Sequence, residues 1–275
     1  MQVFTTKAAL REAVRDWRAA GDTMALVPTK GALHAGHRAL TAQARAEADR
    51  VVVSILSHRA DESPAPCNPE ADLAILRATG VDAVFRPENP EFHAAGAQTV
   101  VETPELARTL LGKQNPGHFR AVATDLTRLF NIAQPDVAVF GEKHYQQLCM
   151  IRRVVRDLDM PLRITGVPTI READGLALAT RNARLTREDR AAALVLSRAL
   201  TEAEAMARTG ITASRLRAWV AAHIQAEPRA DLQSADIRDA DTLATIAGPL
   251  SGPAVILLAV RLGKVQLIDQ RVVTP

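Results

Sequence analysis

The stretch MALVPTKGALHAGHRAL, Met24 to Leu40, decides how the rest of the sequence is interpreted. Its apolar start, Met24 to Val27, is followed by Pro28 and Gly31, and helix-compatible residues resume at His34. An apolar run, a Pro/Gly break and a renewed helical pattern are typical of a strand, a tight turn and the first turn of a helix. We therefore expect a β-strand that leads directly into a helix carrying two histidines.

The spacing of His34 and His37 indicates an anion site at the start of this helix. Residues three apart share one face of a helix, and Gly36 between them lacks the Cβ that would hold a ligand away from the backbone. A helix N-terminus with unpaired N–H groups attracts anions, so two added imidazole donors would suit a phosphate chain. The alternative is a pair of ordinary surface histidines, because H-x-G-H also occurs by chance. The preceding turn favours the phosphate site.

The composition is that of a globular, non-exported protein. The 275 residues are 47% hydrophobic, enough for two domains or one large α/β domain. A net charge of +3 and 3% aromatic residues argue against a nucleic-acid partner. Cys67 and Cys149 form no C-x-x-C motif, so neither a disulfide framework nor a structural zinc site is indicated. A reducing cytoplasm is therefore the expected environment. No apolar window reaches the length of a membrane span and no signal peptide is evident, so we expect a cytoplasmic protein without a membrane partner.

Strand and helix patterns alternate through the first part of the chain. This alternation predicts a mostly parallel sheet with helices on both faces, and the polar loop 57–69 then follows a strand at the sheet edge where ligands bind. The expected strands are 24–27, 51–56, 81–85, 99–102, 136–141 and 163–168, and the expected helices are 7–20, 34–48, 70–79, 104–111, 121–132 and one from Lys143.

The pattern changes after Pro168. A charged loop, 169–182, precedes a long helix from Thr186 to about Arg208 and a second helix over 213–226. Three strand candidates follow at 230–239, 254–263 and 265–273. The sequence therefore predicts an α/β domain over residues 1–169 and a smaller α+β domain over residues 170–275.

Two further segments carry candidate site residues. GEKHYQQL, Gly141 to Leu148, again follows a strand and opens a helix, where Lys143 offers a compact cation and Gln146 and Gln147 offer amides. The alternative for this segment is a solvated helix N-terminus. READGLALATRN, ending at Asn182, contains Arg181 but is weak evidence alone, since charged linkers are common.

Several motifs together resemble the pantothenate synthetase family: VPTKGALHAGH, PGHFRAVAT, LFNIAQPDVAVFGEKHYQQL, GVPTIREADGLAL, TRN and LIDQ. H-x-G-H alone is shared with class I aminoacyl-tRNA synthetases and nucleotidylyltransferases, whereas GEKxYQQL and READGLA are not. The resemblance implies a Rossmann-like domain of the H-x-G-H nucleotidylyltransferase type, a C-terminal lid over the nucleotide, a homodimer, ATP and Mg²⁺. It also implies a ligase that joins a carboxylic acid to an amine through an acyl-adenylate, with release of pyrophosphate and AMP.

The resemblance assigns roles to particular residues. It implies that the catalytic residues are His34, His37, Lys143 and Arg181. It implies an ATP site formed by Pro28, Thr29, Lys30, Gly36, Gly141, His144, Ile170, Ala179 and Thr180. It implies an acid site at the positions of Lys30, His58, Asp61, Asp125 and Gln147. Asp72 could approach Mg²⁺ through water, although a solvated position on a helix is the preferred interpretation.

Departures from the family pattern cluster in the acid site. Asp61 replaces a glutamine that would hold pantoate, His58 replaces an asparagine, Lys30 a methionine, and Asp125 a valine expected against the dimethyl group. A carboxylate desolvated there without a partner would cost about 1–3 kcal/mol. We therefore expect an acid pocket altered for a more polar acid, for example one that bears an amino group. The alternatives are a genuine pantothenate synthetase, a nucleotidylyltransferase and a nucleotide-binding protein without turnover.

Overall fold

The fold described here is that of a computed structural model, and it covers residues 1–56 and 68–275. The chain divides into two compact units, which are described separately. Unit 1 contains Met1–Gly141 and Met150–Val167, and unit 2 contains Glu142–Cys149 and Pro168–Pro275. None of the helices in the described part of the chain combines the length and apolar character needed to cross a bilayer.

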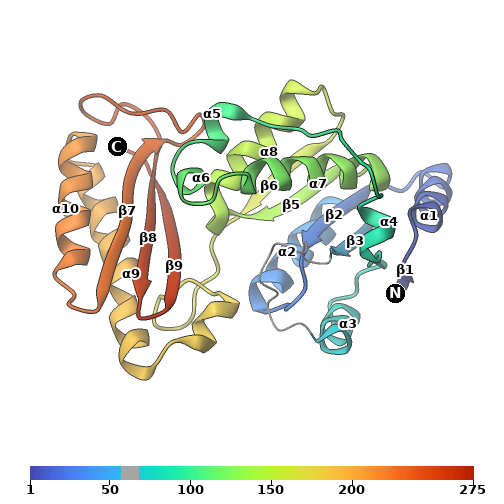
Figure 1. Cartoon of the computed structure of the whole chain (residues 1–275), viewed down its shortest axis with the longest axis horizontal. Coiled ribbons are helices and arrows are strands. Elements are labelled where there is room, and N and C mark those ends of the chain that lie inside the picture. Colours follow the sequence, from blue (N-terminus) through green and yellow to red (C-terminus); the bar gives the residue numbers. More distant parts are fainter. Residues whose placement is uncertain (57–67) are drawn as a thin grey trace. The chain divides into compact units, whose positions relative to one another are not determined.

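Unit 1 is built on a six-stranded sheet in the order β1-β4-β3-β2-β5-β6, with parallel pairing throughout (Figure 1). The strands are β1 (Gln2–Phe4), β2 (Met24–Thr29), β3 (Arg50–Ile55), β4 (Ala83–Phe85), β5 (Val137–Gly141) and β6 (Arg163–Val167). The helices that begin in this part of the chain are α1 (Lys7–Ala19), α2 (Ala35–Glu47), α3 (Pro69–Ala78), α4 (Asn89–Phe92), α5 (Pro104–Ala107), α6 (Leu111–Gln114) and α7 (His118–Ala133).

Helices cover both faces of this sheet, as the alternating pattern predicted. On one face, alternate strand residues such as Val53 and Val139 pack with Ala44 of α2 and Leu76 of α3. On the other face, Phe140 of β5 meets Phe130 of α7 edge to face, with ring centroids 6.5 Å apart. Burial of both faces explains why the strands are continuous apolar runs rather than alternating ones.

Unit 2 is a three-stranded antiparallel sheet, β7-β8-β9, packed against two helices (Figure 1). Its elements are η1 (Glu142–His144), the start of α8 (Tyr145–Asp157), η2 (Thr180–Arg184), α9 (Arg187–Ala207), α10 (Ala213–Gln225), β7 (Ala230–Asp239), β8 (Ala254–Leu262) and β9 (Val265–Val273). The segment Glu142–Cys149 belongs here because, for example, Tyr145 donates a hydrogen bond to the carbonyl of Ala240 at 2.9 Å.

The expected α/β class with a smaller α+β part is confirmed, but two local expectations are wrong and one strand was missed. Residues 99–102 form no strand; instead the Thr124 hydroxyl bonds the backbone of Val101. The expected helix 104–111 is wrong because α5 ends at Ala107, and Leu110, with a positive φ of 50°, precedes a second short helix, α6. The short edge strand β1 was not expected, because three residues carry too little pattern to predict one.

Candidate functional site

The two histidines form the cap of α2. His34 is the N-cap residue in extended conformation, and its Nδ1 accepts a hydrogen bond from the Gly36 N–H at 3.1 Å. The His37 Nδ1 in turn accepts from the His34 N–H at 3.2 Å, which completes a reciprocal capping box. The ring centroids lie 4.2 Å apart. Because each Nδ1 accepts, the neutral rings carry their hydrogen on Nε2, the form in which an imidazole donates to an anion.

Gly36 is required by the ring of His34. A Cβ at position 36 would lie 2.8 Å from Cε1 and 3.0 Å from Nδ1 of that ring. Contacts this short do not occur, so any larger residue would displace the imidazole. The sequence pattern attributed this glycine to close approach of a ligand, and the structure adds a reason within the chain itself.

The turn before the histidines is fixed by its own side chains. Thr29, at the end of β2, is buried and donates its hydroxyl hydrogen to the Ser54 carbonyl of β3 at 2.6 Å. Pro28 is a strand residue opposite Ser54, and Lys30 is exposed. Gly31 and Ala32 follow with positive φ values of 81° and 52°. The candidate ATP-binding residues of this turn are therefore held at the carboxyl ends of the strands.

Strand order places the carboxyl ends of β2 and β5, from which the two candidate motifs begin, side by side. β2 pairs with β3 on one side and with β5 on the other. After β2 the chain adds β3 and β4 on one side of it and later β5 and β6 on the other, so the strand order reverses between β2 and β5. Open parallel sheets bind ligands at such a switch point, beyond the carboxyl ends of the strands. Gly141, the last residue of β5, faces Leu40 of α2, whose Cδ2 would lie 4.0 Å from a Cβ at this glycine.

In unit 2, Lys143 is held by a loop that follows it in sequence. Its Nζ donates to the carbonyls of Leu178 at 2.8 Å and Ala177 at 3.3 Å. Burial lowers the pKa of Lys143 to about 8; Arg181 and Arg171 also lower it, while the carboxylate of Asp269 opposes the change. Lys143 is therefore mainly protonated at neutral pH but begins to lose its charge just above it.

The loop that holds Lys143 is itself fixed by ion pairs. Arg171 makes a bidentate pair with Asp269 of β9, at 2.8 and 2.9 Å, and the Asp269 side chain is 1% exposed. Glu172 accepts from Asn182 and from Arg190. Sequence reasoning assigned Asp269 no role, although a carboxylate inside an apolar strand pattern is a signal, since such groups are buried only when paired.

The remaining candidates in unit 2 lie near this loop or on α8. Arg181 is exposed, and its Nη1 donates to the Gln266 carbonyl at 3.4 Å. Because the guanidinium of Arg181 lowers the Lys143 pKa, the structure brings these two cations together. Ala179 is the extended residue before η2, Thr180 begins η2, and Ile170 accepts from the Leu178 N–H at 2.9 Å. His144 is exposed, and Gln147 is half-buried.

Among the candidate acid residues, Asp125 has a partner. The Nδ1 atom of His93 lies 3.7 Å from the Asp125 carboxylate and 3.2 Å from Nη1 of Arg128. Arg128, on α7, also donates to the Phe92 carbonyl of α4 at 3.1 Å. The sequence-based argument assumed a carboxylate without a partner, and this assumption is wrong.

Three expected site residues need separate statements. His58 and Asp61 lie outside the described residues. Asp72 is 3% exposed, so the expected solvated position is wrong. Its two oxygens accept backbone N–H groups of Ala32 and Leu33 rather than facing water. Within residues 1–56 and 68–275, no group of three or more His, Cys, Asp or Glu side chains is arranged to hold a metal ion.

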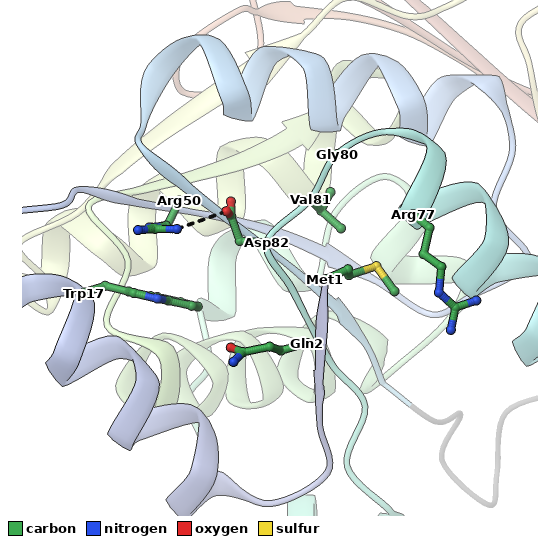
Figure 2. A pocket seen from close by; sticks show the side chains of 8 residues that line it. All are labelled: Met1, Gln2, Trp17, Arg50, Arg77, Gly80, Val81 and Asp82. Carbon is green, nitrogen blue, oxygen red and sulfur yellow. Dashed lines mark hydrogen bonds and ion pairs between the residues drawn. The ribbon is translucent and has the colours of Figure 1, made fainter.

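A pocket of about 520 Å³ is lined by other residues than the candidates (Figure 2). Arg50, at the start of β3, pairs there with Asp82, just before β4, so this hollow lies at the amino ends of the parallel strands. Ligands of such sheets bind at the opposite edge. The lining residues are Met1, Gln2, Trp17, Arg50, Arg77, Gly80, Val81 and Asp82.

Comparison with known proteins identifies the family. The family model for pantoate-beta-alanine ligase matches residues 2–272. The chain belongs to the pantoate-beta-alanine ligase family. Pantothenate synthetases of Agrobacterium fabrum and Rhizobium rhizogenes are each 45% identical to it over 280 residues, covering 99% of this chain and 96% of theirs. The expected family, and with it a ligase that forms carbon–nitrogen bonds, is confirmed.

Solved members of the pantoate-beta-alanine ligase family share the fold. The pantothenate synthetase of Thermus thermophilus is 38% identical, with a TM-score of 0.91 and full coverage of both chains. The pantoate-beta-alanine ligase of Francisella tularensis, solved with beta-gamma ATP and beta-alanine, is 29% identical, with a TM-score of 0.78, covering 98% of this chain and 97% of that one.

Proposed function

We propose that this chain joins pantoate to β-alanine at the expense of ATP. The observation that carries the proposal is the family match over residues 2–272, with relatives 45% identical over nearly their whole length. In the first step, a carboxylate oxygen of the acid attacks the α-phosphorus of ATP and pyrophosphate leaves. In the second, the amine nitrogen attacks the acyl carbon, AMP leaves and an amide forms. Neither step needs a covalent bond to the protein.

The proposed work of the protein is to neutralise charge on the phosphates. The Nε2–H groups of His34 and His37 are donors fixed by the α2 cap, and Lys143 supplies an ammonium with two of its three hydrogens already directed at carbonyls. Arg181 adds a guanidinium, whose charge already lowers the pKa of Lys143. Donors positioned before the reaction stabilise developing negative charge without reorganisation.

The Gly36→Ala variant separates phosphate binding by the histidines from the stability of the fold. We expect ATP to bind about tenfold more weakly, equivalent to ~1.4 kcal/mol, because the new Cβ displaces the His34 ring. Stability should be nearly unchanged, since alanine favours a helix over glycine by about 1 kcal/mol and loss of the His34 cap costs about the same. Calorimetric titration with a non-hydrolysable ATP analogue and thermal unfolding measure the two effects. Gly80→Ala would be a poor control, because Gly80 has a positive φ that alanine seldom adopts. Ala35→Ser, on the same helical turn as Gly36, is the better control. Equal affinity in Gly36→Ala and the parent protein would contradict this role.

Pantoate is proposed as the acid, although the sequence first suggested a more polar one. Part of the case against pantoate was an unpaired Asp125, and this carboxylate lies beside His93 instead. An acid pocket altered through Lys30, Asp125 and the positions of His58 and Asp61 is the second candidate. The replacement of family residues at these four positions favours the altered pocket.

ATP–pyrophosphate exchange tests the acid directly. We expect pantoate to drive exchange at least tenfold faster than any other member of a panel of small hydroxy and amino acids, with β-alanine alone as the negative control. Strong exchange with a different acid would overturn pantoate while keeping the ligase. A dinucleotide product would indicate a nucleotidylyltransferase, and ATP binding without exchange across the panel would indicate a protein without turnover.

Three related expectations are part of the proposal. A homodimer and a cytoplasmic location are typical of the family that the sequence resembles. Mg²⁺ would enter with ATP, because it usually binds through substrate phosphates and at most one or two carboxylates.

A further inference from the structure

Asp72 is a buried carboxylate whose oxygens are both used by one turn of the backbone. Its Oδ2 accepts from the Ala32 N–H at 2.9 Å, and its Oδ1 accepts from the Leu33 N–H at 2.8 Å. Asp72 lies on α3 and is 3% exposed. Carboxylate acceptors of backbone N–H groups are among the stronger hydrogen bonds of proteins. The contact spans about forty residues of sequence and joins α3 to the turn after β2.

The turn needs such a partner. Gly31 and Ala32 both have positive φ, 81° and 52°, and for alanine this conformation costs about 1–2 kcal/mol. The conformation directs consecutive N–H groups to one side, an arrangement that ordinarily attracts an anion. In this chain the anion is a side chain of the protein itself. The carboxylate therefore offsets the cost of a backbone conformation that alanine seldom adopts.

The position of the turn controls the position of the imidazoles. Leu33 is buried, and the next residue is His34, the N-cap of α2. On the other side of the turn, the Thr29 hydroxyl bonds β3, and the Gly31 N–H lies 3.4 Å from that hydroxyl oxygen. The chain between β2 and α2 is thus fixed from the sheet by Thr29 and from α3 by Asp72.

We propose that Asp72 is a positioning residue, which holds the turn 30–33 so that His34 and His37 present their donors to the phosphates of ATP. The inference rests on the proposed function in so far as ATP binds at this turn. Asp72 acts through the backbone and touches neither the substrate nor the reacting atoms. This differs from ligation of Mg²⁺ through water, because its oxygens are already engaged with N–H groups.

Hydrogen exchange in the unaltered protein is the first test. We expect the amides of Ala32 and Leu33 to exchange at least a hundredfold more slowly than those of an exposed turn, because both are bonded to a buried carboxylate. Exchange as fast as in an exposed turn would overturn the proposal, and this measurement requires no variant to fold.

Asp72→Asn is the second test. The amide keeps the volume of the side chain but directs an N–H donor at one of the two backbone donors. We expect KM for ATP to rise about tenfold and kcat to fall by less, with faster exchange confined to the turn 30–33 and the start of α2. KM for β-alanine should stay within twofold. A loss of thermal stability with unchanged KM for ATP would assign Asp72 a structural role alone and overturn the inference.

Asp82→Asn is the matched control. Asp82 also accepts a backbone N–H, that of Val51, and it pairs with Arg45 and Arg50, but at the amino ends of the strands (Figure 2). Its loss should reduce stability and leave KM for ATP unchanged. An equal rise of KM in both variants would contradict a local effect. Titration of the parent protein and of Asp72→Asn with an ATP analogue separates the two proposals. No binding by the parent protein refutes the ATP site. Equally tight binding by the parent protein and by Asp72→Asn refutes only the role of Asp72.

Discussion

Lys143→Ala is expected to lower the rate of ATP–pyrophosphate exchange by about 10²–10³-fold, the usual cost of removing one fixed donor to developing negative charge. The effect should fall mainly on kcat, since an ammonium directed at transferring phosphates acts most strongly in the transition state. Lys264→Ala, an exposed lysine in the same unit, should change the rate by less than twofold. A Lys143→Ala protein with near-normal exchange would remove this residue from the site.

The same lysine predicts a dependence on pH. Lys143 is active when protonated and has a pKa of about 8, so exchange should decrease as the pH rises through 8. Stability should change in the opposite direction. The unfolded lysine, with a pKa of about 10.4, binds a proton that the folded one has lost, so unfolding becomes more costly between the two values. Parallel pH profiles of exchange and of the free energy of unfolding measure both. In Lys143→Met, the parts of both pH profiles that come from this lysine should disappear.

His34→Asn is expected to lower exchange by about 10²–10³-fold with little change in stability. Asparagine is a preferred N-cap and can keep an acceptor for the Gly36 N–H, but it lacks a group at the position of Nε2. His34→Ala should lose the cap as well and cost about 1 kcal/mol of stability. Exchange assays and urea unfolding of the two variants separate capping from phosphate binding. If His34→Asn exchanged normally, the histidine would be a cap and nothing more.

Much of the first unit could be predicted because its signals are local. β2, the turn at Gly31 and the start of α2 follow from apolar runs, Pro/Gly breaks and a capping pattern, and each depends on a few neighbouring residues. The same holds for the buried strands β3 and β5 and for the three strands of unit 2. Edge strand β1 escaped prediction because its three residues owe their conformation to pairing with β4.

The candidate site could be predicted only in part. Motifs located His34, His37, Lys143 and Arg181, since each lies beside a recognisable turn or loop. The partners of these residues come from distant segments. Asp72 contacts the turn after β2 from α3, Asp269 holds Arg171 from β9, and His93 accompanies Asp125 from beyond α4. No local pattern indicates such contacts.

The sequence by itself determined the order of strands and helices, the family and the residues that carry charge, because hydrophobic period, turn residues and motifs are local or linear features. Only the tertiary structure decided where the Lys143 pKa lies and that Asp72 is buried rather than solvated. These properties depend on desolvation and on hydrogen-bond partners tens of residues away, and both are set when the elements pack together.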